Sequence, residues 1–174
     1  MLNRPSPGID DDTRTALGAV GSATQRAIRG LRTLLVEVYP PNLETEPLES
    51  LVAELLLPLA ARGVVTNLQV DPDVVVSTSS KALIWRAARE AIQNTLAHAT
   101  PTTVTITARR RGNNAVLEVV DDGRGFEPKT LPATPQRGHF GLRLLDDFTR
   151  EYGGMLTISS APGRGTTITL VCPR

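Results

Sequence analysis

An acidic residue stands where the sequence pattern calls for a buried side chain. In the run VVDDGRGF, residues 119–126, Asp121 follows alternating apolar residues and shares the phase of Leu117 and Val119. Successive side chains of a strand point to opposite faces, so Asp121 is predicted to point inward with those two residues. A buried carboxylate without partners is strongly unfavourable, and Asp121 therefore needs hydrogen-bond donors.

A hydroxyl group has the same placement in the last apolar run. Thr166 is in phase with Ile168, so its side chain is predicted to lie on the apolar side of that strand. Gly123 and Gly125 follow the acid and let a ligand approach the backbone closely. A buried acceptor, a hydroxyl and an open backbone together suggest a site for a flat heterocycle that carries an amino group.

A polar stripe lies on the segment REAIQNTLAHA. Glu90, Asn94 and His98 recur at four-residue steps, so a helix places them on one face among small apolar residues. Asn94 could offer a neutral oxygen to Mg²⁺, which prefers oxygen ligands and completes its shell with waters and substrate phosphates. Glu90, one turn away, is placed to accept a proton or to orient an attacking group.

The N-terminal half of the chain has helical periodicity. Apolar residues at three- and four-residue steps predict helices over residues 13–39, 47–62 and about 80–99, with a strand at 64–70. Pro40 and Pro41 end the first helix, whose interior glycines weaken it, so that it needs a partner to pack on. Gly63 ends the second helix, and the serines and threonine of residues 77–80 can cap the third.

The C-terminal half changes to a period of two. It predicts a hairpin of two strands around a Gly112-Asn113-Asn114 turn, a loop from Gly123 to Gly138, a helix over about 139–152, and strands at 155–160 and 166–172. This order predicts an α/β two-layer sandwich. It consists of a mixed, mainly antiparallel sheet with helices on one face, plus the N-terminal helix.

Composition limits the classes of function. The 174 residues are enough for one domain with an appended helix, and with 40% hydrophobic but only 3% aromatic residues the core must be aliphatic. A net charge of +1 supplies no global field for nucleic acid or a membrane. The single Cys172 excludes an internal disulfide, and no long apolar stretch or signal segment is visible, so a soluble cytoplasmic chain is expected.

Four segments, in this order along the chain, carry a family resemblance. REAIQNTLAHA, VVDDGRGF, GHFGLRLL and SAPGRGTTITL resemble the asparagine box, the two glycine boxes and the final Gly-Thr strand of the ATPase domain of sensor histidine kinases. The similarity is to the nitrate-sensor, NarL-partnered subfamily, whose ATPase domain has the GHKL or Bergerat fold. Because RAIRGLRTLLVEVYPPNLE resembles the end of the dimerisation helices, residues 1–45 are expected to be a remnant of those helices, and residues 46–174 the ATP-binding domain.

The resemblance implies roles at the matching positions. Asp121 would accept the adenine amino group, Thr166 would reach the adenine side, Asn94 would hold Mg²⁺, and Glu90 would be the catalytic acid/base. The segment between Gly123 and Gly138 would be a lid over ATP. The further nucleotide-binding residues implied are His98, Gly123, Gly125, Phe126, Gly138, His139, Gly141 and Leu142.

The function implied is that of a Mg-ATP-binding catalytic domain of a two-component histidine kinase. It would supply the γ-phosphate to a histidine outside this chain, because neither His98 nor His139 matches an acceptor motif. That acceptor was removed or lies on another polypeptide, so little activity is expected from the chain alone. A response regulator with a helix-turn-helix output would receive the phosphoryl group, the N-terminal helix would form a homodimer, and the parent kinase could be membrane-anchored.

Other interpretations stay open. Phe140 stands where many relatives have a glycine, which leaves the geometry of the second glycine box open. Asp121 taken alone could be a turn-forming Asp. A serine kinase that binds a sigma factor would share the ATP site, and so would a nucleotide-binding module without catalysis. Gyrase and chaperone ATPases fit less well, because they need a coupling domain for which this length leaves no room.

Overall fold

The computed structural model describes residues 42–127 and 140–174. The predicted helix over 13–39 and the greater part of the predicted lid lie outside the described residues. The helices and strands, in chain order, are α2 (Leu48–Ala60), β1 (Val65–Val70), α3 (Thr78–Asn94), the π-helical turn η1 (Thr95–Ala99), β2 (Thr103–Arg111), β3 (Asn114–Asp121), α4 (Phe140–Glu151), β4 (Met155–Ser160) and β5 (Thr166–Pro173).

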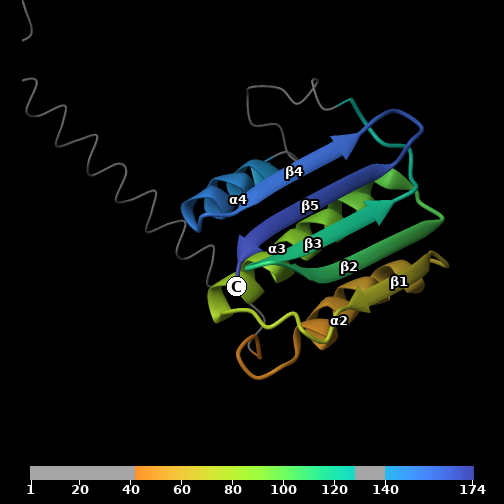
Figure 1. The fold of residues 1–174 in the computed structure, drawn as a ribbon. Coiled ribbons are helices and arrows are strands. Elements are labelled where there is room, and N and C mark those ends of the chain that lie inside the picture. The colour runs from red at the N-terminus through yellow and green to blue at the C-terminus, as the bar shows by residue number, and fades with distance from the viewer. Residues whose placement is uncertain (1–41, 128–139) are drawn as a thin grey trace, which may run out of the picture. The chain divides into compact units, whose positions relative to one another are not determined.

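The five strands form one sheet in the order β1-β2-β3-β5-β4. β1 pairs with β2 in parallel, and every other neighbouring pair is antiparallel. The helices α2, α3 and α4 cover one face of this sheet (Figure 1). The predicted two-layer α/β fold with a mixed, mainly antiparallel sheet is therefore confirmed.

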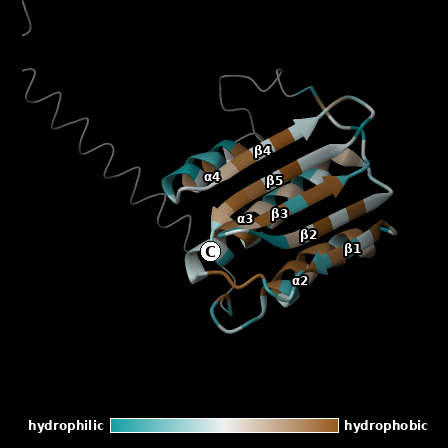
Figure 2. Ribbon diagram, viewed as in Figure 1, coloured by the Kyte–Doolittle hydropathy of each residue, from teal (hydrophilic) through white to brown (hydrophobic). Residues whose placement is uncertain are grey.

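The strand alternation explains which face the helices cover. In β2, Val104, Ile106 and Ala108 are buried against the helices, while the threonines between them point to the other face and are half-buried. This alternation of hydropathy is visible along β2 and β3 in Figure 2. The core is aliphatic, as the composition predicts, with Leu117 and Leu170 fully buried.

Cys172 lies on the buried face of β5. It is fully buried and forms no disulfide. Burial raises the pKa of its thiol to about 11, so the thiol stays protonated at neutral pH.

The long third helix begins where the sequence predicts and ends differently. The side chain of Ser77 caps α3 by accepting a hydrogen bond from the backbone N–H of Ser80 at 3.3 Å. The predicted helix runs to about Ala99, but its last turn, Thr95–Ala99, is π-helical and stops at Thr100, whose φ is 48°. A π-helical turn is wider than an α-helical one and is frequent at functional sites.

The hairpin turn consists of Gly112 and Asn113 alone, because Asn114 already belongs to β3. In the part of the chain that the structure describes, no helix has the length and apolar character needed to cross a membrane.

Candidate functional site

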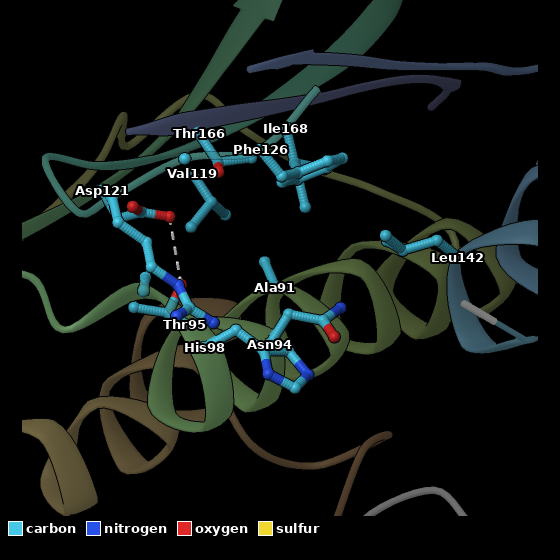
Figure 3. A pocket seen from close by; sticks show the side chains of 13 residues that line it. Ala91, Asn94, Thr95, His98, Val119, Asp121, Phe126, Leu142, Thr166 and Ile168 are labelled. Atoms are coloured by element: carbon cyan, nitrogen blue, oxygen red, sulfur yellow. Dashed lines mark hydrogen bonds between the residues drawn. The ribbon is translucent and has the colours of Figure 1, made fainter. Parts of the chain in front are cut away.

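A cavity of about 280 Å³ lies between the C-terminal end of the long helix and the inner face of the sheet (Figure 3). The helix α3 and the turn η1 form one wall of the cavity, and the C-terminal end of β3 and the N-terminal end of β5 form the opposite wall. The loop after β3 and the start of α4 form its sides. The lining residues are Ala91, Asn94, Thr95, His98, Ala99, Val119, Asp121, Arg124, Gly125, Phe126, Leu142, Thr166 and Ile168.

Asp121 points into the cavity, as its strand phase predicts. Its side chain is 6% exposed, and it accepts hydrogen bonds from the backbone N–H of Gly123 at 2.9 Å and from the hydroxyl of Thr95 at 3.3 Å. Burial raises the pKa of Asp121, and the hydrogen bonds from Gly123, Thr95 and Thr166 oppose that rise. The acid is thus held in a low-dielectric site by neutral donors, with no ion pair to Asp121 among the described residues.

The neighbouring Asp122 points away from the cavity. Its carboxylate accepts hydrogen bonds from the backbone N–H groups of Thr102 at 2.8 Å and Thr103 at 2.9 Å, and from the Thr102 hydroxyl. These bonds, that of the Thr102 hydroxyl first, lower the pKa of Asp122. Asp122 therefore fixes the start of β2 and takes no part in the cavity.

Thr166 lines the cavity and is linked to a residue that the sequence did not single out. The Ser160 hydroxyl donates to the carbonyl of Gly165 at 2.8 Å and accepts from the N–H of Phe126 at 2.9 Å. A serine has one hydroxyl proton, so at the 3.1 Å contact between the two hydroxyls Thr166 is the donor. Thr166 consequently offers only lone pairs toward the cavity.

Two glycines permit close backbone packing around the acid. Gly165 has φ 68°, and a Cβ at this position would overlap the carbonyl of Asp121. Gly125 has φ 59°, and a Cβ there would overlap the carbonyl of Ala161. The loop after β3 and the β4–β5 turn can therefore lie against each other only because both positions lack a side chain.

The predicted polar stripe on the long helix is present. The amide nitrogen of Asn94 donates to Glu90 Oε1 at 3.1 Å, which leaves the amide oxygen of Asn94 available to a cation. This neutral oxygen fits Mg²⁺. Among the described residues no group of three or more His, Cys, Asp and Glu could hold a metal.

Glu90 lies beside the cavity and not in its lining. Its carboxylate is half-buried and occupies the space that a side chain at Gly141 would fill, at the start of α4. Gly141 thus brings the helix α4 close to the carboxylate of α3. His98 lines the cavity from η1 and is exposed.

The structure brings most of the predicted nucleotide-site residues together. Asn94, His98, Asp121, Gly125, Phe126, Leu142 and Thr166 line the cavity, while Glu90, Gly123 and Gly141 lie next to it and do not line it. Gly138 and His139 lie outside the described residues.

Several lining residues were missed by the sequence reasoning. Val119 and Ile168 share a strand face with Asp121 and Thr166, so strand phase could have found them. Ala91 and Thr95 neighbour the polar stripe, and Arg124 lies within the first glycine box. None of these three carried a separate signal for a role in the site.

A model of the histidine kinase-, DNA gyrase B- and HSP90-like ATPases matches residues 80–174, which include every described residue of the cavity. The chain belongs to this family. The family match confirms that this is an ATP-binding ATPase domain with the expected fold.

Relatives of this ATPase domain are sensor kinases. A sensor-like histidine kinase of Chloroflexus aurantiacus is 32% identical over 90% of this chain, and the sensor histidine kinase NarS of Mycobacterium tuberculosis is 28% identical over 99% of it. The chain spans 27% and 39% of the length of these two relatives. The histidine kinase domain of the blue-light activated kinase of Erythrobacter litoralis has the same fold, with a TM-score of 0.60 at 21% identity over 72% of this chain and 58% of that one.

Proposed function

We propose that this chain is the Mg-ATP-binding catalytic domain of a two-component sensor histidine kinase. In this proposal the cavity takes the adenine base and the region between Asn94 and the start of α4 takes the phosphates. The observation that carries the proposal is the inward-facing Asp121, a buried acceptor that neutral donors hold at the cavity.

The base end of the cavity supports adenine as the ligand. Asp121 and Thr166 both present acceptors, and an exocyclic amino group supplies donors to match. Val119, Ile168 and Leu142 provide apolar surface for the flat base. Removing adenine's amino group would leave a buried carboxylate without its ligand partner, and this loss is the basis of selectivity.

The α3 end supports binding of Mg²⁺ and phosphate. Asn94 would hold the ion through its amide oxygen, and the bound ion would neutralise phosphate charge. Glu90 already bonds to Asn94 and lies against Gly141, so it would orient the attacking group or accept its proton. The glycine boxes beyond Asp121, with Gly123, Gly138 and His139, would close over the nucleotide.

The similarity to sensor histidine kinases supports a proposal for the wider organisation. Residues 1–45 would be a remnant of the dimerisation helices and 46–174 the ATP-binding domain. The phosphoryl group would pass to a histidine on a helix outside this chain, and from there to a response regulator with a helix-turn-helix output. The domain would act in the cytoplasm.

The test is phosphotransfer in trans. The chain is incubated with Mg²⁺ and γ-labelled ATP, together with a purified helical hairpin of a related kinase that carries the acceptor histidine. Acid-labile, base-stable label on the hairpin supports the proposal. Binding of ATP without any phosphohistidine would instead identify a non-catalytic nucleotide module, and acid-stable label on a protein serine would identify a serine kinase.

Glu90→Gln separates catalysis from binding in the same assay. Glutamine keeps an acceptor for the Asn94 amide but cannot take a proton, so ATP affinity should stay within about twofold while phosphotransfer falls about 100-fold. Glu54→Gln, on the exposed face of α2, is the matched control. Equal phosphotransfer rates for Glu90→Gln and the parent chain would remove Glu90 from the mechanism.

A further inference from the structure

A buried threonine next to the acid has an unusual partner. Thr95 is 4% exposed, begins the π-helical turn and lines the cavity. Its hydroxyl donates to Asp121 Oδ2 at 3.3 Å, across the interface between helix and sheet. An alanine or valine would fill this aliphatic surrounding without a polar group to satisfy, so the hydroxyl calls for an explanation.

A second buried threonine shows what a helical hydroxyl ordinarily does. Thr149 on α4 is fully buried and donates to the carbonyl of Leu145, four residues earlier, at 2.8 Å. Thr95 sits in the same type of position but donates to a carboxylate far away in the sequence. Both are buried helical threonines, but their hydroxyls donate to different kinds of acceptor.

The contact fixes the orientation of the acid. Gly123 N–H holds Oδ1 at 2.9 Å and Thr95 holds Oδ2, so the carboxylate cannot rotate without breaking one of these bonds. Thr95 has one hydroxyl proton and spends it on Asp121, so toward the cavity it can only accept. Figure 3 shows both groups at the same end of the cavity.

We propose that Thr95 is a positioning residue that sets the affinity for the amino group of the bound base by holding the Asp121 carboxylate toward it. This inference rests on the proposed function and adds to it a residue that acts through another. Thr95 need not touch the nucleotide, since its effect passes through Oδ2 of Asp121.

The charge of the acid also depends on this contact. The charged or titratable groups around Asp121 are Asp122 on the same strand end, Arg124 in the following loop and His98 on η1, while Thr166 from β5 adds a neutral hydrogen bond. Burial raises the pKa of Asp121 and the Thr95 hydroxyl lowers it. Without that hydroxyl, the acid would become protonated at a higher pH and cease to accept from an amino group.

The experiment compares two nucleotides on Thr95→Val, which keeps the shape and removes the hydroxyl. The full chain is titrated with ATP and with purine riboside 5′-triphosphate, which lacks the amino group. We expect Thr95→Val to weaken ATP about tenfold and the analogue by less than about twofold, as for the loss of one hydrogen bond to a charged group. Thr95→Ser should restore ATP binding. On acidification, ATP affinity should begin to fall at a higher pH in Thr95→Val than in the parent chain or in Thr95→Ser.

The controls decide what kind of role Thr95 has. Thr149→Val removes an equally buried hydroxyl and should leave the ratio of the two affinities unchanged, and Thr95→Ala serves as a second variant without the hydroxyl if Thr95→Val does not fold. Equal weakening of both nucleotides, no rescue by serine, or an unmoved pH profile would overturn the inference. If the parent chain prefers ATP to the analogue and Thr95→Val keeps the same preference, only the role of Thr95 is overturned. If the parent chain binds neither nucleotide, the proposed function itself is overturned.

Discussion

Two adjacent carboxylates at the end of β3 have opposite surroundings. Asp121 faces the cavity, where burial raises its pKa, and Asp122 faces the start of β2, where hydrogen bonds lower its pKa. The residues have the same chemistry and follow one another in the chain, but Asp121 is the last residue of β3, Asp122 follows the strand, and their side chains contact different parts of the fold. What the side chain of an acid contacts therefore decides whether it serves ligand binding or the fold.

The contributions of Asp121 and Asp122 to the stability of the fold depend on pH in opposite ways. An acid whose pKa is raised by folding costs stability while it is ionised; that cost begins to decrease as the pH falls to the raised pKa and is gone below the ordinary value of 3.8. An acid whose pKa is lowered adds stability above its ordinary value of 3.8, and this is lost as the pH falls through the lowered pKa. Asp121 therefore reduces the stability of the fold at neutral pH, and Asp122 adds to it.

The largest effect is expected from Gly165→Ala, which disturbs the backbone of Asp121 and Asp122 together. A Cβ at Gly165 would overlap the peptide that joins Asp121 to Asp122, and its φ of 68° is unfavourable for alanine. Because backbone atoms cannot move aside, we expect a loss of about 3 kcal/mol in the free energy of unfolding, measured by urea denaturation.

Gly163→Ala is the matched control for that variant. Gly163 has φ 73° but nothing within 4 Å of the added Cβ, so it should lose only the backbone term of about 1 kcal/mol. Equal losses in the two variants would mean that the contact with the Asp121–Asp122 peptide contributes nothing.

Asp121→Asn tests only the carboxylate that faces the cavity. The Asn oxygen can accept from Gly123 and its NH₂ can donate to the Thr95 hydroxyl, so the free protein should unfold at no lower temperature than the parent chain at pH 7. That NH₂ group then opposes the amino group of adenine, and ATP should bind about 10- to 100-fold more weakly. Calorimetric titration and thermal unfolding measure the two effects, and a joint loss of both would contradict a ligand-directed role.

Asp122→Asn tests the contact of Asp122 with the start of β2 and should produce the smallest change. The amide oxygen of Asn can still accept from the backbone N–H groups of Thr102 and Thr103, but it is uncharged, and an NH₂ group replaces the oxygen that accepts from the Thr102 hydroxyl. Because the side chain is exposed, we expect a loss of only about 1 kcal/mol. The difference from the parent chain should shrink below pH 3.8, where Asp122 of the unfolded parent becomes protonated, and should vanish once the pH falls through the lowered pKa of the folded state. ATP affinity should not change, and urea denaturation from pH 7 to pH 2.5 measures the stability.

Strand phase is why the sequence allowed the fold and one wall of the site to be predicted. The alternation in β3 and β5 places Asp121 and Thr166 on the buried face without any knowledge of what lies opposite. The same alternation could not show that β1 pairs with β2 in parallel, because the pairing partner depends on how α2 and α3 cross the sheet.

The missed residues depend on contacts between distant segments. Thr95 looks like any small helical residue until the helix is seen to pass beneath β3, and Ser160 acts through Phe126 and Gly165, which lie on two different loops. The π-helical turn at Thr95–Ala99 has no pattern that separates it from an α-helical continuation. The roles of Glu90, Asn94 and the other site residues in catalysis stay predictions until they are measured.

The single thiol on β5 gives this domain an internal reporter of opening. Because Cys172 is fully buried and its thiol is protonated at neutral pH, a maleimide or aromatic disulfide reagent can react with the sulfur only when the packing of α3 against β5 opens locally. The rate of labelling then follows this local opening, without a dye or an introduced probe. Since β5 also carries Thr166, slower labelling with added nucleotide would connect occupancy of the cavity to the packing of the helices against the sheet.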